Sequence, residues 1–433
     1  MTILQDTVPT DHVVRYCSDL IRLDTTVGHR PERGAAEYVA ERLAAAGLEP
    51  LMLEGAPGRT NVVARIPGRE PGLPPLLVHS HLDVVPADPS GWTVHPFSGE
   101  VRDGYVWGRG AVDMKDMVAM ILDVVTTMHT SGRAPRRDVV LAFVADEEDG
   151  GTHGAAWLVE HHPDLFADCD VAIGEVGGFS VPTPTGSFYL LETAQKGAFT
   201  LELTANGLAG HGSMLNEHNS VRALARTVAA IADHPFPLRL TATTQDFLEQ
   251  LGEAFGLSDT ADAPERALAA IGEVGRIVGA TLRHTATPVA LRAGGAPNVV
   301  PSQAHARIDC RSVPGHEEEF LAELRRLIPP EVTSSVVPRG AGHENGLDGA
   351  LADTISAALL AEDPTARLVP FCMSSATDAR HFSRLGIRCF GFVPLRLPAD
   401  GDFVSMFHGT DERVAVESLT FGARVLNRFL ATY

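Results

Sequence analysis

The sequence predicts an α/β protein of two domains, one built on buried strands and the other on a half-exposed sheet. The chain has 433 residues, which is more than a single hydrophobic core usually holds. Three short apolar runs, at 75–81, 139–145 and 169–174, are typical of buried parallel strands. The run Phe199–Ala205 instead alternates apolar and polar residues, as a strand with one exposed face does. The fold is therefore expected to change character near Gln195.

The first part of the chain supplies helices that should cover the buried strands. From Asp11 to about residue 51 the apolar residues have helical spacing and predict two helices. Residues 61–68 alternate like a strand that ends in a turn. Two further helices are expected at 117–130 and 153–162, packed on the sheet.

The middle of the chain has the pattern of a separate layer. After the strand at 199–205, the sequence predicts a helix, two strands, a helix and a strand, at about 219–232, 289–292, 304–311, 316–327 and 331–337. This is the element order of a ferredoxin-like α+β layer. We therefore expect residues 195–337 to form an inserted domain, with the helical stretch 246–284 as an elaboration within it. Residues 1–194 and 338–433 should together form the other domain.

Polar residues follow each buried strand at its carboxyl end. His81 and Asp83 follow the first strand, the pair Glu147 and Glu148 follows the second, and Glu175 follows the third. Open α/β sheets bind their ligands at this edge. These side chains are therefore expected to lie close together.

Two more candidates lie outside the strands. Asp113 stands in the glycine-containing run 106–115, and His408 stands on a polar loop that leads into the last helix. Zinc takes imidazole nitrogen and carboxylate oxygen, and a two-metal site needs a carboxylate that bridges ions ~3.5–4 Å apart. The order of histidine, aspartate and paired glutamates predicts a two-metal hydrolytic site. Alone, a residue such as His81 is more often a hydrogen-bonded structural histidine.

On these motifs the chain resembles the M20 family of metallopeptidases over nearly its whole length. That family includes aminoacylases, carboxypeptidases, dipeptidases and succinyl-diaminopimelate desuccinylase. The resemblance implies a mixed-sheet, di-zinc aminopeptidase-like catalytic domain, with the inserted ferredoxin-like domain as a lid that can also join two copies as a homodimer. It implies two divalent metal ions, zinc first, although cobalt and manganese accept similar ligands. The implied metal ligands are His81, Asp113, Glu148, Glu175 and His408.

The resemblance also implies roles for residues around the metals. Asp83 would orient the imidazole of His81, and Glu147 would be the general base. His211, in Gly210-His211-Gly212-Ser213, would polarise the scissile carbonyl, often from the neighbouring copy of a dimer.

Two more lid residues, Asn298 and Arg311, match residues that hold the substrate carboxylate in relatives. From the residues alone, a surface ion pair is the more frequent role for Arg311, and a turn position is the more frequent role for Asn298.

The implied activity is hydrolysis of an amide bond next to a free carboxylate, in a dipeptide, a peptide C-terminus or an N-acyl amino acid. In the family, Glu147 would deprotonate a water that bridges the metals. A homologue that binds peptides or metals without turnover is one alternative, and a dinuclear hydrolase of another ester or amide class is a second. The sequence has no Gly-x-Ser-x-Gly elbow and no His-Glu-x-x-His motif, which argues against a serine hydrolase and a helix-borne zincin.

Charge and composition restrict the partners. The formal net charge of −20 and the pI of about 5.3 argue against a nucleic acid and against an anionic membrane surface. The sequence shows no signal-like start, no apolar run long enough to span a bilayer and no Cys-x-x-Cys pair among its five cysteines. A cytoplasmic location and a small-molecule or short-peptide substrate are therefore expected.

Overall fold

The computed structural model describes residues 10–347, 349–398 and 403–433, and a large mixed sheet forms its centre. The strand order is β1-β2-β6-β3-β7-β18-β9-β16, with β8 and β17 also paired to β9. The neighbours β6, β3, β7 and β18 run parallel, whereas β1 and β2 pair antiparallel to each other and β2 to β6. The bounds of these strands are β1 Leu51–Ala56, β2 Arg59–Ile66, β3 Leu76–His81, β6 Val139–Val144, β7 Val171–Gly174, β8 Ser180–Thr183, β9 Gly186–Gln195, β16 His343–Glu344, β17 Ala366–Met373 and β18 Arg388–Gly391.

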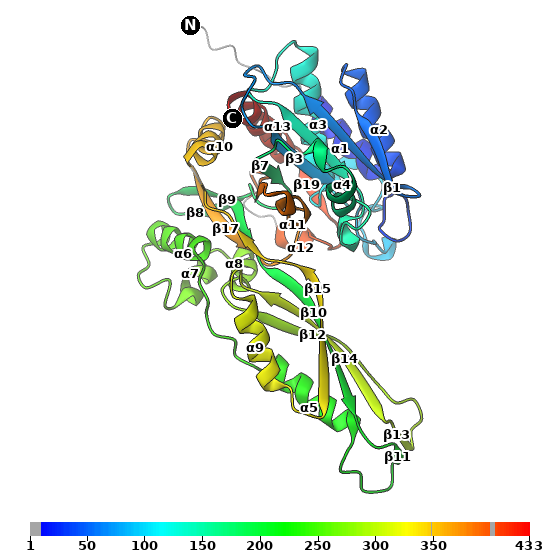
Figure 1. Ribbon diagram of the computed structural model, residues 1–433. Helices are drawn as coiled ribbons and strands as arrows, with labels where there is room; N and C mark the ends of the chain where they lie inside the picture. Colours follow the sequence, from blue (N-terminus) through cyan, green and yellow to red (C-terminus); the bar gives the residue numbers. More distant parts are fainter. Residues whose placement is uncertain (1–9, 348, 399–402) are drawn as a thin grey trace.

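Helices cover both faces of this sheet (Figure 1). Strand side chains alternate between faces, so Leu76 and Val78 of β3 pack in one hydrophobic cluster and Leu77 packs in another. The first cluster contains residues of α1, α2, α3, α10 and α13, and the second contains residues of α4 and α11. The bounds are α1 Thr10–Arg22, α2 Arg33–Ala45, α3 Lys115–Thr130, α4 Ala155–His161, α10 Gly349–Leu360, α11 Ala379–Phe382, α12 Phe403–Met406 and α13 Val416–Thr432.

A small antiparallel sheet ties the loop before α3 to the end of the chain. It consists of β4 (Glu100–Arg102), β5 (Tyr105–Trp107) and β19 (Arg413–Ala415), in the order β19-β5-β4. Because β5 precedes Asp113 and β19 follows His408, this pairing brings two distant candidate residues to the same region.

The second domain is an antiparallel sheet with helices on one face. The strands β10 (Gly197–Asn206), β12 (Thr285–Ala293), β14 (Gln303–Ser312) and β15 (Val332–Gly340) pair in the order β12-β14-β10-β15. With α5 (Ser220–Ala232) and α9 (Glu317–Leu327), the chain order is strand, helix, two strands, helix, strand, as in a ferredoxin-like layer. Leu201, Leu224 and Phe320 belong to the shared core of this sheet and its helices.

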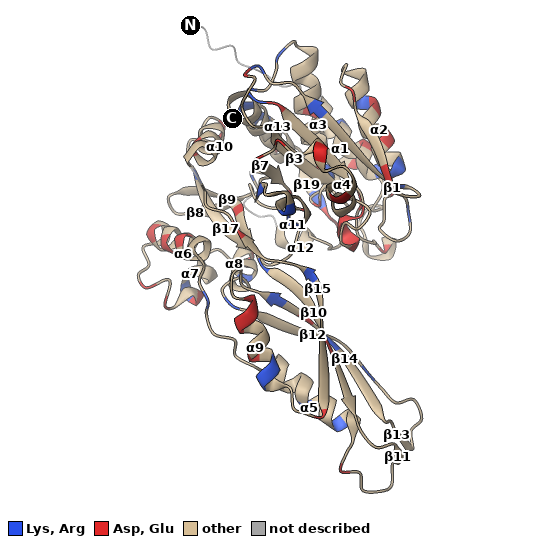
Figure 2. Cartoon of the chain, viewed as in Figure 1, with Lys and Arg blue, Asp and Glu red and all other residues tan. Residues whose placement is uncertain are grey.

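The helix α9 of the second domain has charged residues at both ends that stabilise it. Three glutamates occupy its first turn and two arginines its last, so both ends complement the helix dipole. Figure 2 shows this division of charge along α9.

This second domain, which is the expected lid, extends away from the large sheet (Figure 1). The strand β9 leads through Lys196 directly into β10, and β15 returns to β16. At the far end of the lid, β11 (Gly210–His211) pairs with β13 (Val299–Val300).

The helical segment expected inside the lid packs elsewhere. Its helices are α6 (Ala242–Phe255), α7 (Pro264–Ala270) and α8 (Glu273–Gly279). Buried residues of these helices, such as Phe247 and Val278, belong to the core cluster of the large sheet and not to that of the lid. The expectation of an elaboration within the lid is therefore corrected, because apolar faces on the segment are buried against β17. In the described part of the chain, no helix combines the length and apolarity needed to cross a bilayer.

Candidate metal centre

The parallel strands bring the candidate ligands to one edge of the large sheet. His81 ends β3, while Glu147 and Glu148 follow its neighbour β6, and Glu175 follows its other neighbour β7. Since β6, β3 and β7 are parallel, their carboxyl ends meet. The loop before α3 adds Asp113 to this edge.

Asp113 stands between two histidines. Its Oδ1 lies 3.1 Å from His81 Nε2, and its Oδ2 lies 3.2 Å from His408 Nε2. His81 Nε2 is also 3.5 Å from Glu175 Oε2, and His408 Nε2 is 3.2 Å from Glu148 Oε2. Among the described residues, these groups form two potential metal sites, one of His81, Asp113 and Glu175 and one of Asp113, Glu148 and His408. The two sites share the Asp113 carboxylate, as a bridging ligand requires.

The chemistry of these groups fits divalent cations. Glu148 Oε1 and Glu175 Oε1 are buried and have no hydrogen-bond partner among the described residues. Burial raises the pKa of both carboxyls, and neighbouring carboxylates add to the increase. Hydrogen bonds to Asp113 and Glu148 raise the pKa of His408 to about 10. A divalent cation held by these residues would compensate the buried negative charge of the carboxylates. The carboxylate oxygens and imidazole nitrogens are donors that suit zinc.

Asp83 holds the turn that carries the paired glutamates. Its two carboxylate oxygens accept the backbone N–H groups of Glu147, at 3.1 Å, and of Glu148, at 3.0 Å. Toward His81 Nδ1, the nearer atom is the backbone oxygen of Asp83 at 3.0 Å, with Oδ1 at 3.6 Å. Asp83 thus positions both the imidazole and the glutamate turn, and leaves His81 Nε2 facing Asp113 and Glu175.

Glu147 has an environment that favours the protonated form. Burial raises the pKa of its carboxyl well above the ordinary value, and the negative charges of Glu175 and Asp378 raise it further. A raised pKa makes a carboxylate a stronger proton acceptor than an ordinary one. This is the electrostatic requirement for a general base at this position.

Three residues around the centre have left-handed backbone conformations. Asp146, Val176 and His408 have φ angles of 67°, 58° and 57°. His408 is a candidate ligand, and the other two residues border Glu147 and Glu175. This conformation is unfavourable for a side chain branched at Cβ, such as that of valine. Such strain persists where the surrounding structure determines the backbone, and it clusters at functional sites.

Sequence reasoning missed the carboxylate that holds the Asp113 loop. Buried Glu412 accepts N–H groups from Gly110, Val112 and Asp113 at 3.0, 2.8 and 3.2 Å. Its Oε2 also accepts Arg109 Nη1 at 2.6 Å. No periodic pattern marks such a residue, because its partners lie about three hundred positions earlier in the chain.

Arg109 extends the connection to the second histidine. Its Nη2 donates to the backbone oxygen of His408 at 3.2 Å. The Arg109–Glu412 pair therefore ties the Asp113 loop to the His408 loop, so both partners of the Asp113–His408 contact have fixed backbones.

The chain is similar to known proteins in both sequence and fold. Residues 77–432 match the sequence model of peptidase family M20/M25/M40. The chain belongs to this family. Among similar proteins is the N-fatty-acyl-amino acid synthase/hydrolase PM20D1 of Xenopus tropicalis, 30% identical over 382 residues, 82% of this chain and 72% of that protein. Aminoacylase-1 of Dictyostelium discoideum is 28% identical over 344 residues, 78% of either chain.

A solved structure shows that the whole fold is shared. The M20 family metallo-carboxypeptidase Sso-CP2 from Sulfolobus solfataricus superposes with a TM-score of 0.73 at 18% identity, covering 98% of this chain and 99% of that one. The predicted family and the two-domain α/β fold are therefore confirmed. The enzyme names of the relatives support a hydrolase of peptides or acyl amino acids at the level of the family.

In this M20 chain the lid candidates separate into two groups. His211 on β11 and Asn298 beside β13 lie together, since Gly212 N donates to Asn298 O at 2.8 Å. The His211 side chain is exposed and contacts Ser213 Oγ at 2.8 Å. Figure 1 places β11 and β13 at the end of the lid away from β3 and β7. A single chain thus does not bring His211 and Asn298 to its own metal centre.

Arg311 lies on β14, at the end of the lid sheet where Lys196 connects β9 to β10. It lies opposite Ala198 of β10, and the next residue, Ser312, lies opposite Gly197. Its Nε and Nη2 donate to Asp309 at 2.6 and 3.1 Å. Asp309 also accepts Arg339 Nη1 at 2.9 Å, so the cluster carries one excess positive charge.

The segment 374–380 lies beside the loop that follows Glu148. Asp378 in it is buried, and neither of its carboxylate oxygens has a hydrogen-bond partner among the described residues. A methyl group added at Gly151 would lie 2.7 Å from Asp378 Oδ1, so this carboxyl lies against the loop after Glu148.

His79 is a core residue whose ring packs 5.0 Å from that of Phe382.

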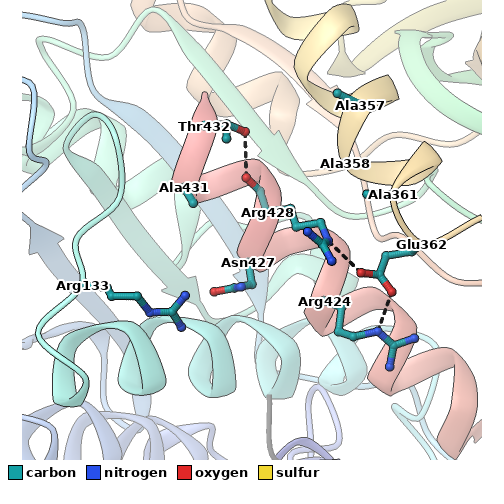
Figure 3. A pocket seen from close by; sticks show the side chains of 10 residues that line it. All are labelled: Arg133, Ala357, Ala358, Ala361, Glu362, Arg424, Asn427, Arg428, Ala431 and Thr432. Carbon is teal, nitrogen blue, oxygen red and sulfur yellow. Dashed lines mark hydrogen bonds and ion pairs between the residues drawn. The ribbon is translucent and has the colours of Figure 1, made fainter. Parts of the chain in front are cut away.

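A separate cavity of about 270 Å³ lies between α10 and α13 (Figure 3). Two of its arginines, Arg424 and Arg428, donate to the same carboxylate of Glu362 at 2.6 and 2.7 Å. The described residues that line it include no histidine and no candidate ligand. It is therefore distinct from the metal centre.

Proposed function

We propose that this chain is a metal-dependent hydrolase of an amide bond next to a free carboxylate, in an N-acyl amino acid, a dipeptide or a peptide C-terminus. The observation that carries the proposal is the pair of triads that share Asp113, with Glu147 on the adjoining turn. The proposed ligands are His81, Asp113, Glu148, Glu175 and His408, and the proposed ions are two zinc ions, with cobalt or manganese as substitutes.

Bound metals would supply Lewis acidity toward the carbonyl oxygen and lower the pKa of water. The side chains of this chain perform the remaining tasks. Glu147 takes the proton of the attacking water and delivers it to the leaving nitrogen, because its raised pKa lets it hold that proton. Asp83 keeps Glu147 in place through the backbone hydrogen bond.

The lid supplies the substrate-binding groups in this proposal. Arg311 binds the substrate carboxylate, for which a guanidinium can donate two parallel hydrogen bonds, although Asp309 engages two of its nitrogens in this conformation. His211 polarises the scissile carbonyl and Asn298 assists in binding. We propose domain boundaries at 1–194, 195–337 and 338–433. In this proposal the sheet of β10, β12, β14 and β15 closes over the substrate, while α6, α7 and α8 stay on the large sheet.

We further propose a homodimer in which the lid tip of one copy completes the metal centre of the other. Support comes from the exposure of His211 and the remoteness of β11 from the metal centre of its own chain. We also propose a cytoplasmic location, because all five cysteines are free and buried, as in reducing compartments.

The test is an activity panel of N-acyl amino acids and dipeptides, with and without a chelator and added zinc, beside Glu147→Ala. We expect turnover that the chelator abolishes and that Glu147→Ala lacks. Metal binding without turnover of any compound would favour the binding-protein alternative. Turnover of phosphate esters in a parallel panel would instead favour a dinuclear hydrolase of another class.

A further inference from the structure

An apolar cavity of about 280 Å³ opens beside the metal centre. Asp113 and His408 are part of its wall, so a group bound there is adjacent to two of the three candidate ligands of the second metal site. Of the eleven described residues that line the cavity, eight are apolar and none is lysine or arginine. The cavity therefore suits an uncharged hydrocarbon group and offers no lysine or arginine to a carboxylate.

A chain of aromatic rings forms one part of the wall. Phe371, Phe179 and Phe403 follow one another with ring centroids 6.0 and 5.2 Å apart, and Phe403 lies 5.1 Å from Phe407. The first three side chains are buried in the core, whereas Phe407, next to His408, is half-buried. This wall is fixed by core packing and leads to the metal ligand, so the cavity exists before a substrate arrives.

The helical segment of α6, α7 and α8 supplies another part of the wall. Ile277 of α8 lines the cavity and is half-buried. Beyond α8, buried Lys196 donates to the backbone oxygens of Ala280 and Arg283, each at 2.8 Å. At the start of the segment, Thr243 N donates to Glu344 Oε1 at 2.7 Å.

Both anchors belong to the connections between the domains, since Lys196 lies between β9 and β10 and Glu344 on β16. The position of Ile277 is therefore set by Lys196 and Glu344, which lie in the connections between the domains, although α8 itself falls within the lid part of the sequence.

We propose that this cavity binds the apolar acyl chain of the substrate and that Ile277 of the inserted segment limits the chain's length. The inference rests on the proposed amide hydrolysis, which sets the orientation of the substrate. The substrate carboxylate lies at Arg311, the scissile carbonyl lies at the metal centre, and the acyl chain lies beyond it in the cavity. A cavity of about 150 Å³ holds benzene. By that ratio the present cavity holds up to about ten carbon atoms.

The test uses N-acyl-L-alanines from acetyl to dodecanoyl with three proteins. These are the wild type, Ile277→Trp, which fills the cavity, and the matched control Arg276→Trp, whose side chain on the same helix is 80% exposed. Initial rates give kcat/KM for each compound. Calorimetry gives Kd for the same compounds in the Glu147→Ala background, where no turnover is expected.

We expect kcat/KM to rise by about fourfold for each methylene that is buried, to at least about a hundredfold between acetyl and octanoyl in the wild type. Ile277→Trp should lose about tenfold or more on octanoyl and stay within about twofold on acetyl. Arg276→Trp should follow the wild type. Ile277→Ala, which enlarges the cavity and covers the case in which Ile277→Trp does not fold, should move the optimum to longer chains.

Identical chain-length profiles in the wild type, Ile277→Trp and Ile277→Ala would overturn the proposal. If no compound is hydrolysed but Kd falls with chain length and rises in Ile277→Trp, the amide hydrolysis fails while the apolar site stands. If neither rate nor Kd depends on chain length, the cavity is not an acyl site, whatever the outcome of the activity panel.

Discussion

The metal centre and the lid tip differ in how firmly the protein holds their functional side chains. At the metal centre, Asp83 fixes the glutamate turn and Glu412 fixes the Asp113 loop, each through several hydrogen bonds to backbone N–H groups. At the lid tip, the side chain of His211 is exposed and bonds to Ser213, two residues along the chain. A single chain thus brings together the proposed ligands and the proposed base, whereas the groups proposed for the carbonyl and the carboxylate depend on closure or on a second copy.

The largest expected effect separates the base from the ligands within the metal centre. Glu147→Gln should lower kcat by about 10²–10⁴-fold and retain both metal ions, because the amide cannot take the proton. Glu148→Gln should lose activity together with one equivalent of metal. Steady-state kinetics beside metal analysis on the same samples checks both. Loss of metal from Glu147→Gln would place that residue among the ligands.

A slightly smaller effect is expected at the lid tip. His211→Ala should lower kcat by about 10²–10³-fold, the range for a lost oxyanion donor, and leave the metal content unchanged. If His211 acts in the neighbouring copy, mixing Glu147→Gln with His211→Ala should restore about one quarter of wild-type activity, because half of the randomly paired dimers contain one intact site. No recovery on mixing, with His211→Ala inactive, would place His211 in its own chain's site.

Metal removal should affect the two regions unequally. At a metal concentration about 100 times Kd, binding adds about 2.7 kcal/mol to the free energy of unfolding of the part that holds the ions. Chelation should therefore lower the melting temperature of the catalytic domain and leave the lid unchanged. Hydrogen exchange in β3, β7 and β14 measures the two regions separately, and equal loss of protection in β14 would contradict the contrast.

The smallest effect is expected from the residue that joins the two loops. Glu412→Gln keeps the shape but weakens the bonds to Arg109 and to the Asp113 loop, so metal affinity should fall by about 10–100-fold, as for other partners of metal ligands. Saturating metal should restore most of the activity. The exposed Glu417→Gln on α13 is the matched control. Unchanged affinity in Glu412→Gln would show that the Asp113 loop holds its conformation without this carboxylate.

Sequence reasoning worked best where local pattern and function coincide. The runs around Val78, Leu141 and Ile173 are strands, and the polar residues that follow them meet as expected, because parallel neighbours end at one edge. The prediction for the segment around Phe247 and Val278 was wrong in its placement. Helical periodicity shows that a face is buried, but it does not show which core buries it.

The site residues divide in the same way. His81, Asp113, Glu148, Glu175 and His408 could be nominated from the order of their motifs, whereas Glu412 and Ile277 could not. Neither of the latter belongs to a pattern of residue types. Glu412 bonds to a loop about three hundred residues earlier, and Ile277 lines a cavity together with His408, and only the folded chain brings these parts together.

The sequence by itself determined the family, the two-domain α/β fold and the set of residues that can bind metal, because strand patterns and ligand motifs are local. The tertiary structure decided that Asp113 faces both histidines, that the lid tip lies apart from the metal centre, and that α8 closes an apolar cavity beside His408. These depend on distances between segments remote in the chain, which are set by the packing of whole elements against shared cores.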